Sequence, residues 1–442
     1  MPQPRATPAP RPSARRLWCG VAAALAALGL ASPSRGEAPG KLVLRVGTSG
    51  DYAPFSSTGD GGSRAGFDIA VARAYAEERG LGLEFVRFRW PDLARDLAAG
   101  RFDVAMSGIT VQPRRSIAGR FSVPVAESGA VLLMREPGRF ATVEQLNRPD
   151  LRIGVNAGGY LEQVAQEHFP HATLVAIADN AAVREALLAG DLDAAVTDSL
   201  EATQWKRGAE DLGQSAPFTR DRKAYLVRPD HPTLAADLDR WLLDREADGS
   251  LAKLRREHLG DAAEVRTATP LAALVAAMDE RLALMPFVAA AKRRAGLPLE
   301  VPEREALVLE AAVTGTREAA ARAGVAPLPD GAVRAVFAAQ LAAAKEVQGN
   351  ALRDPSFKPE PPIPDLDTQL RPALLRIGEQ IGSLLVALPP GEDDDTLRAA
   401  ARDGLRTPRL SPDSIAGIAE ALAKLTQART ALPRPAREDP KR

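Results

Sequence analysis

Between residues 41 and 262 the sequence alternates short apolar runs with amphipathic segments, and this alternation constrains the fold most strongly. Runs such as KLVLRV, LRIGV and DAAVTD have the length and composition of buried strands, whereas GFDIAVARAYAEERG has helical periodicity. Alternating strands and helices predict a parallel α/β sheet. Because the alternation occurs in two sets followed by a late strand, KAYLVRP, we expect two lobes and a cleft between them. Lobe 1 is expected over about 41–134 and 229–262, and lobe 2 over about 135–228.

The second half of the chain predicts an all-helical domain over 271–435, joined to the first half by a linker at 263–270. Its first helical segment has an apolar stripe at three- and four-residue steps: Leu271, Leu274, Met278, Leu282, Met285 and Val288. Arg281 and Lys292 fall in the same stripe, and neither has an acidic residue three or four positions away. Either their stems bury while the charged heads reach water, or an anionic ligand supplies the missing partner.

Further cations and amides recur along the helical half. Arg304 follows in the PERE run, Lys345 and Gln348 lie on the segment AVRAVFAAQLAAAKEVQ together with Gln340, and Arg371 opens a later amphipathic segment. A set of cations and amides converging between helices suits a small, compact dianion. In order and spacing, the ERLALM, VAAAK, PERE, FxxQxxAxKxxQ and LRP runs resemble the all-helical, secreted type of chorismate mutase over about residues 266–442.

The resemblance implies conversion of chorismate to prephenate, a unimolecular rearrangement that requires no nucleophile, base or cofactor. The enzyme holds the substrate folded and stabilises negative charge on the ether oxygen. By the resemblance, Arg281, Arg304 and Arg371 bind carboxylates, and Lys292 and Gln348 face the ether oxygen. Lys345 is a further expected member, at a place where related enzymes often carry an acidic or hydroxyl group.

Several runs in the first half resemble a periplasmic amino-acid-binding protein of the type 3 solute-binding superfamily. Within it, the similarity is greatest to cyclohexadienyl dehydratase, which acts on prephenate and arogenate. The matching runs are SGDY (49–52), RFDVAMSGITV (101–111), NxGG (156–159), TDSLEA (197–202) and PF-x4-KAYL (217–226). The resemblance implies formation of phenylpyruvate from prephenate, and of phenylalanine from arogenate.

Loss of carbon dioxide aromatises prephenate only if the ring hydroxyl leaves as water, so a proton donor is needed. A carboxylic acid whose pKa is raised by burial can supply this proton. Glu201 matches the family's general acid, and Asp198, three residues earlier, is expected on the same face of a helix that begins near it. In binding relatives Asp198 takes the ligand's ammonium group, so here it serves arogenate or orients its neighbours.

The same resemblance assigns the remaining contacts of the cleft. Arg115 is expected to bind the side-chain carboxylate, assisted by Thr110 and the backbone of Ser107 and Gly108. Asn156 and Lys223 are expected to position the leaving groups from the second lobe, and Trp90 to stack on the ring. Tyr160 departs from the family, which has a small hydroxyl residue there. The alternatives are that Asp198 and Glu201 are ordinary helix N-terminal carboxylates, that Trp90 belongs to the core, and that Arg115 lies on the surface.

Residues 1–36 predict a secretory signal peptide and therefore a periplasmic protein, because an arginine-bearing stretch precedes a short apolar run. This segment holds five arginines and no acidic residue, so the remainder of a chain with 57 basic and 57 acidic residues has five more acidic than basic ones. That balance argues against nucleic-acid partners and against membrane binding after cleavage.

Cys19 is the only cysteine and the four histidines have no zinc-ligand spacing, so no metal or cofactor is expected. The predicted partners are the small molecules chorismate, prephenate and arogenate, and a homo-oligomer remains open. The competing hypothesis is a solute-binding protein for an aromatic acid, fused to a chorismate mutase.

Overall fold

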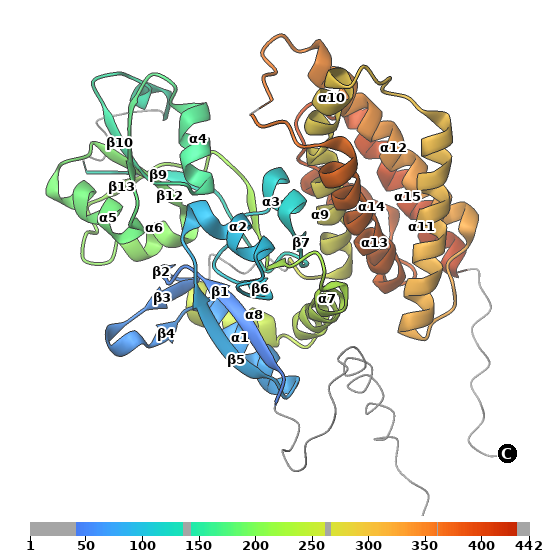
Figure 1. Ribbon diagram of the computed structural model, residues 1–442, viewed down its shortest axis with the longest axis horizontal. Coiled ribbons are helices and arrows are strands. Elements are labelled where there is room, and N and C mark those ends of the chain that lie inside the picture. The colour runs from blue at the N-terminus through green and yellow to red at the C-terminus, as the bar shows by residue number, and fades with distance from the viewer. Residues whose placement is uncertain (1–40, 136–142, 261–266, 360, 431–442) are drawn as a thin grey trace, which may run out of the picture. The chain divides into compact units, whose positions relative to one another are not determined.

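The computed structural model describes residues 41–135, 143–260, 267–359 and 361–430 (Figure 1). The expected signal peptide, half of the expected linker and the C-terminal tail lie outside these residues. The residues from Val43 onward belong to one compact unit, which contains an α/β half and a helical domain. The two fold classes expected from the sequence are both present, in the expected order.

Lobe 1 is a five-stranded sheet in the order β5-β1-β6-β15-β7. Strands β1, β5 and β6 run parallel, and β15 is antiparallel to β6 and β7. The strands are β1 (Val43–Thr48), β5 (Gly82–Arg87), β6 (Val104–Ala105), β7 (Arg120–Phe121) and β15 (Leu226–Val227). The helices of this lobe are α1 (Phe67–Glu78), α2 (Leu93–Ala98), α3 (Pro113–Ala118), α7 (Pro232–Ala247) and α8 (Ser250–Leu259). A small sheet is formed by β2 (Asp51–Tyr52), β3 (Ser56–Thr58) and β4 (Arg64–Ala65), with short 3-10 turns at η1 (Asp60–Gly62) and η2 (Trp90–Asp92).

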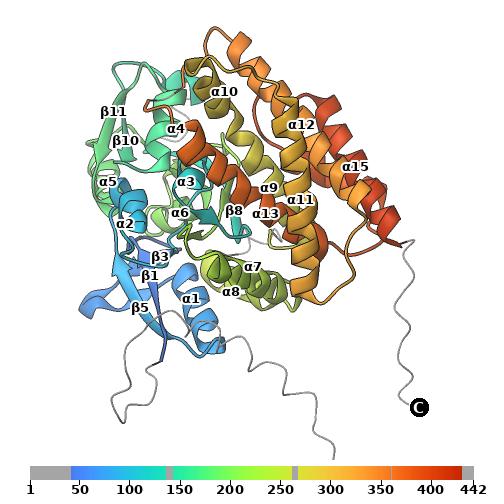
Figure 2. The ribbon, with the colours of Figure 1, turned by 45° about the vertical axis from the view of Figure 1, so that its right-hand side comes forward.

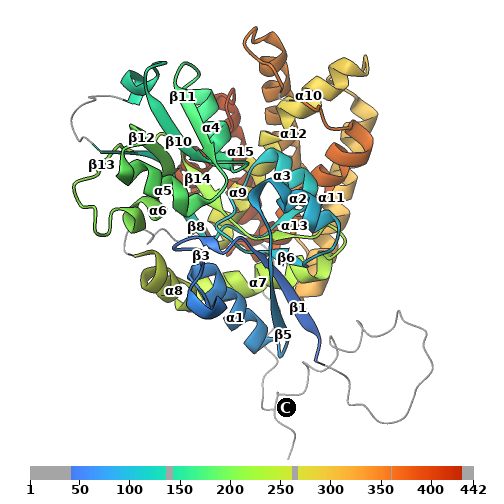
Figure 3. The same cartoon turned by 60° about the vertical axis from the view of Figure 1, so that its left-hand side comes forward.

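Lobe 2 repeats this arrangement with the strand order β11-β10-β12-β9-β13 (Figure 3). Its strands are β9 (Ala130–Met134), β10 (Arg152–Asn156), β11 (Thr173–Ile177), β12 (Ala194–Asp198) and β13 (Gly213–Gln214). Its helices are η3 (Val143–Leu146), α4 (Tyr160–His168), α5 (Asn180–Ala189) and α6 (Ser199–Trp205). Local sequence sets these limits: the Asp179 carboxylate caps α5 by accepting from the amide of Ala181, and Gly190 ends the helix with φ 89°.

The lobe boundaries differ from those expected from the sequence. Strand β9 pairs with β12 in lobe 2, and β15 pairs with β6 in lobe 1. The chain therefore crosses between the sheets at β8 (Ala126–Ser128) and β14 (Asp221–Lys223), which pair with each other. The expected limits at 134 and 228 missed this because both crossing strands are short and continue directly into apolar runs. We refer to β8 and β14 as the hinge pair.

The helical domain has seven α-helices among the described residues, and its long helices lie side by side (Figure 2). They are α9 (Pro270–Ala283), α10 (Met285–Arg294), α11 (Pro302–Ala323), α12 (Asp330–Arg353), α13 (Arg371–Ala387), α14 (Asp394–Gly404) and α15 (Pro412–Thr430). A π-type turn, η5 (Leu366–Leu370), precedes α13. The proline-rich segment between α12 and η5 has no helix or strand among its described residues, as its composition predicts.

Candidate functional sites

A cavity of about 350 Å³ lies among α9, α10, α11, α12 and α13, within the size range of small-molecule sites. Its lining includes every residue that the sequence analysis assigned to the mutase site: Arg281, Lys292, Arg304, Lys345, Gln348 and Arg371. Gln340 is fully buried and does not line it. The remainder of the wall is largely apolar, with side chains such as Met285, Val288 and Leu341.

Arg281 is the most confined cation of this rear cavity. It is 5% exposed, so its head does not reach bulk water, and its Nη1 atom has no hydrogen-bond partner among the described residues. Burial lowers the pKa of Arg281 to about 10, which still leaves the guanidinium charged at neutral pH. A buried, charged and incompletely bonded guanidinium is costly unless a ligand anion pairs with it. The geometry therefore favours the ligand interpretation of Arg281 over snorkelling.

The other cations of the cavity have partial partners. The Lys292 ammonium donates to the carbonyl oxygen of Leu299 at 2.6 Å. Burial lowers the pKa of Lys292, the positive charge of Arg371 lowers it further, and Glu305 opposes both. Lys345 pairs with Glu305 of α11 at 3.2 Å, and Arg371 pairs with Asp367 one turn earlier. Glu305 is thus an acidic member of this site that the sequence analysis did not single out, although it stands in the PERE run.

Gln348 presents an amide to the cavity. Its nitrogen donates to the carbonyl of Ala344 at 3.2 Å and approaches the sulfur of Met285 at 3.4 Å, whereas its buried oxygen has no partner among the described residues. Rotation of the amide by half a turn exchanges the donor and the acceptor. The side chain therefore has hydrogen-bonding capacity left for a ligand.

The second site is the cleft between the lobes, a cavity of about 30 Å³ that offers room for about two waters. Its lining includes Trp90, Thr110, Arg115, Asn156 and Lys223, as expected from the sequence. It also includes Tyr52, Tyr160 and Asn180, which the sequence analysis did not assign to ligand binding. The cleft is closed by direct contacts between lobes.

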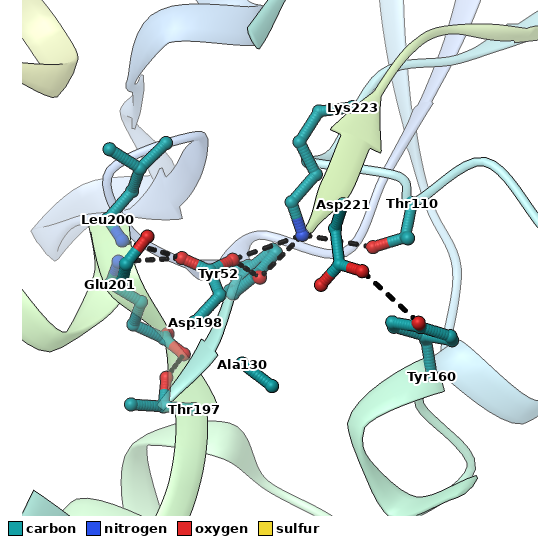
Figure 4. Close-up of polar contacts among 12 residues, drawn as sticks. Tyr52, Thr110, Ala130, Tyr160, Thr197, Asp198, Leu200, Glu201, Asp221 and Lys223 are labelled. Atoms are coloured by element: carbon teal, nitrogen blue, oxygen red, sulfur yellow. Dashed lines mark hydrogen bonds and ion pairs between the residues drawn. The ribbon is translucent and has the colours of Figure 1, made fainter. Parts of the chain in front are cut away.

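Lys223 lies at the centre of these contacts (Figure 4). Its ammonium group is 3.1 Å from the Asp198 carboxylate, 3.0 Å from the Thr110 hydroxyl and 3.2 Å from the Tyr52 hydroxyl. The Tyr52 hydroxyl donates to the same Asp198 carboxylate, which joins lobe 1 to lobe 2. Lys223 belongs to the hinge strand β14 rather than to the sheet of lobe 2, from which the sequence analysis expected it to act.

Asp198 and Glu201 occupy the start of α6, as the helix prediction required. The Asp198 carboxylate caps α6 by accepting from the amides of Leu200 and Glu201, both at 2.9 Å. Burial alone would raise the pKa of Asp198, but Lys223 and Tyr52 outweigh it and hold the pKa below its usual range. Asp198 is therefore both a helix cap and a charged partner of Lys223.

Glu201 is 1% exposed and lies behind the wall of the cleft rather than in its lining. Its two oxygens accept from the amide of Asn180 and the hydroxyl of Thr197, both at 2.5 Å. Burial, reinforced by the negative charge of Asp198, raises the pKa of Glu201 well above its ordinary value. The raised pKa favours the protonated form of Glu201, and Asn180 lies between this carboxyl group and the cleft.

The side of the cleft where Arg115 is expected to bind a carboxylate is less open than the sequence suggested. Arg115 is buried, donates to the carbonyl of Thr110 at 3.1 Å and lies 5.7 Å from the ring centre of Trp90. Burial lowers the pKa of Arg115 to about 10, so it remains charged. Ser107 does not line the cleft, because its hydroxyl is bonded to Ser49 and Ser56 in the layer beneath.

The polar groups of three further residues are already hydrogen-bonded within the protein. The amide of Gly108 donates to the buried carboxylate of Asp68, so it is not free for a ligand. The nitrogen of Asn156 donates to the carbonyls of Ile177 and Ala178 at the end of β11. Tyr160 donates to Asp221 at 3.1 Å (Figure 4), so the residue that departs from the family pattern belongs to the wall of the cleft.

Among the described residues, no cluster of three histidine, cysteine or acidic side chains could hold a metal ion. No helix in those residues has the length and hydropathy required to span a bilayer.

Residues 44–261 match the family described as bacterial extracellular solute-binding proteins, family 3. The chain is also 37% identical over 221 residues to a cyclohexadienyl dehydratase of Pseudomonas aeruginosa, a match that covers 49% of this chain and 82% of that protein. The chain belongs to this solute-binding family. Its helical domain matches a second family, chorismate mutase type II, over residues 272–349. The chain thus unites a solute-binding fold with a domain of an enzyme family.

Two further relatives are less similar in sequence. An L-cystine-binding protein of Escherichia coli is 25% identical over 49% of this chain and 83% of its own length. The crystal structure of an ancestral amino-acid-binding protein, described as a precursor of cyclohexadienyl dehydratase, is 33% identical with a TM-score of 0.46, over 49% of this chain and 95% of that chain.

Proposed function

We propose that this family 3 protein is an exported bifunctional enzyme. The rear cavity converts chorismate to prephenate, and the front cleft converts prephenate to phenylpyruvate and arogenate to phenylalanine. The observation that carries the proposal is the convergence of the six expected cations and amides on one cavity of about 350 Å³. The fusion supports it as well, because the product of the rear reaction is the substrate of the front one. The family and the expected leader support a periplasmic location.

In the rear cavity, we propose that the protein binds the carboxylates of chorismate and stabilises the negative charge that develops on its ether oxygen. Planar guanidinium groups bind carboxylates through two parallel hydrogen bonds, so Arg281, Arg304 and Arg371 suit the two carboxylates of chorismate. Lys292 and Gln348 are the proposed donors to the ether oxygen, where negative charge develops as the carbon–oxygen bond breaks. Neither role requires proton transfer to the substrate.

In the front cleft, the proposed proton donor is Glu201. Its carboxyl proton converts the ring hydroxyl of prephenate into water as the carbon–oxygen bond breaks. Loss of carbon dioxide then leaves an electron pair that completes the aromatic ring. Because Asn180 separates Glu201 from the cleft and the closed cavity is too small for prephenate, we infer that the lobes move apart and Asn180 shifts when the substrate enters.

The alternative is a solute-binding protein for an aromatic acid, fused to a chorismate mutase. Its support is the family itself, whose curated members include binding proteins. Such a protein needs no buried acid with a raised pKa, and this feature of Glu201 favours the dehydratase.

Incubation of the purified protein with chorismate, with prephenate and phenylpyruvate followed separately at neutral pH, distinguishes the hypotheses. We expect prephenate to appear first and phenylpyruvate to follow without added enzyme. The binding-protein hypothesis would be favoured by a different result. Prephenate would then accumulate in an amount equal to the chorismate consumed, and it would decline only at its spontaneous rate. Unchanged chorismate would refute the rear assignment.

A further inference from the structure

We propose that the helical domain supplies a positioning residue for the front cleft: Asp279 of α9 fixes the hinge strand that carries Lys223, acting through Arg222. The inference rests on the proposed dehydratase function of that cleft.

Alternation along β14 places its side chains on two opposite faces. Asp221 and Lys223 face the cleft, where they contact Tyr160 and Asp198. Arg222, between them, points the other way and reaches the helical domain. Its Nη1 atom lies 2.7 Å from the Asp279 carboxylate, and its Nη2 atom donates to the carbonyl of Gly404.

Asp279 is held by the helical domain itself. One carboxylate oxygen accepts from the amides of Arg406 and Thr407, at 2.7 and 2.8 Å, and from the Thr407 hydroxyl at 2.8 Å. The other oxygen binds Arg222. Side-chain exposure is only 12% for Asp279 and 11% for Arg222, so this ion pair is largely desolvated. Breaking one partner of such a pair is costly because the other is left charged and buried.

A second contact holds the other hinge strand. Arg406 of the helical domain pairs at 2.7 Å with Glu127 of β8, which lies opposite Arg222 in the hinge pair. Both strands that connect the lobes are therefore tied to the end of α14 and the residues just after it.

The helical domain also packs on lobe 1. One hydrophobic cluster runs from Val46 and Phe67 of lobe 1 to Leu274 and Ile381 of the helical domain, whereas lobe 2 has two clusters of its own. Arg376 donates to the carbonyl of Ile117 at 3.1 Å, at the end of the helix that carries Arg115 (α3 and α13 in Figure 3). Lobe 1 and the helical domain thus share one core, and the hinge pair is fixed against that core.

Fixing the hinge pair in this way also fixes the position of Lys223. Its ammonium makes three polar contacts within about 3 Å, so a small shift of β14 changes all three together. Misplacement of a catalytic group by about 1 Å can cost on the order of 100-fold in rate. Asp279 therefore influences the front reaction although it contacts neither the cleft nor the rear cavity.

The test compares Asp279→Asn with Asp395→Asn, a control whose side chain is 95% exposed on the same domain. Turnover of added prephenate and of chorismate is measured on the full chain. We expect Asp279→Asn to lower kcat for prephenate by about 10- to 100-fold, with a smaller change in KM, since Arg115 is not displaced. Chorismate turnover should stay within about twofold of the parent, which shows that the helical domain is folded. Asp395→Asn should match the parent in both reactions.

Arg222→Gln and the double variant show whether the effect passes through the pair. If it does, the double variant loses no more activity than the more impaired single variant. Additive losses, or prephenate kinetics unchanged in Asp279→Asn, overturn the inference. If Asp279→Asn fails to fold, Arg406→Gln is measured instead, because it releases the neighbouring strand β8. We expect Arg406→Gln to lower kcat for prephenate several-fold. An unchanged kcat in Arg406→Gln also counts against the inference. A parent protein without prephenate turnover would instead refute the proposed function.

Discussion

The front cleft and the rear cavity arrange their charged groups in opposite ways. The rear cavity is preformed, about 350 Å³ in volume, and keeps one guanidinium buried with an unsatisfied donor. The front cleft is nearly filled, and its charged groups bond to one another across the two lobes. The difference follows from the reaction proposed for each site. A rearrangement needs a preformed site that holds the substrate in one conformation, whereas proton donation needs an acid that is shielded from water until the substrate binds.

The largest effect expected from this comparison is at the acid of the front cleft. Glu201→Gln removes the proton but keeps the shape, so we expect prephenate turnover at neutral pH to fall by about 100- to 10,000-fold. Prephenate should then accumulate from chorismate. Glu210→Gln, an exposed change in the same lobe, is the matched control. Phenylpyruvate formation at the parental rate would rule out Glu201 as the donor.

Lys292→Ala tests the rear cavity in the same way. Loss of a donor to the developing ether anion is expected to reduce chorismate consumption by about 100- to 1,000-fold. Turnover of added prephenate should be unaffected, because Lys292 lies outside the cleft. Lys424→Ala, on an exposed helix face, controls for the loss of a surface charge. Loss of both activities in Lys292→Ala would contradict the separation of the two sites.

Tyr52→Phe tests whether the front cleft is held shut by its own side chains. The substitution removes a hydrogen bond to a charged carboxylate, worth about 1.5–3 kcal/mol. We expect amide hydrogen exchange at the start of α6 to accelerate by about tenfold or more, with the helical domain unchanged. Phe88, which has no hydroxyl and packs on the same Trp90, offers a control as Phe88→Leu. Unchanged exchange at α6 in Tyr52→Phe would show that other contacts keep the cleft closed.

The last expected effect concerns stability rather than activity, at the boundary between the two regions. Burial raises the pKa of Glu280, which faces lobe 1 from α9, to about 7, while a hydrogen bond from Ser116 opposes the rise. A raised carboxyl pKa stabilises the folded state below the unfolded value, near 4.5, and this contribution is lost as the pH rises through 7. The free energy of unfolding should therefore fall between pH 5 and pH 8, by about 2–3 kcal/mol from this group.

Urea unfolding followed by tryptophan fluorescence at the two pH values measures this change. Glu280→Gln should remove its share of the pH dependence, and the exposed change Glu303→Gln should preserve it. Asp68 of lobe 1, whose pKa burial also raises to about 7, should leave some pH dependence in both variants. An identical slope in Glu280→Gln and in the parent would show that Glu280 is not buried as its surroundings indicate.

The sequence predicted the two fold classes and the residues that line the rear cavity. Helical periodicity places Arg281 and Lys292 on one face, and the resemblance to chorismate mutases implied Arg304, Lys345, Gln348 and Arg371. It predicted the front site less completely. Asn180 and Thr197 hold Glu201, but neither falls in a periodic pattern that marks a polar cluster. The contact of Tyr52 with Asp198 joins residues 146 positions apart, and only the fold brings them together. The partner of Lys345 was missed for the same reason, since Glu305 lies on a different helix.

The position of Lys223 affects which ligands the front cleft is expected to prefer. Its ammonium lies 3.1 Å from the carboxylate of Asp198, the residue that the family resemblance assigns to the amino group of a bound amino acid. A ligand with a positively charged amino group must either displace the Lys223 ammonium or bind next to it without a carboxylate to neutralise its charge. Either arrangement weakens binding. If Lys223 takes the place of a ligand's amino group in this way, we expect the cleft to favour keto acids over their amino counterparts, with arogenate the slower of the two proposed substrates.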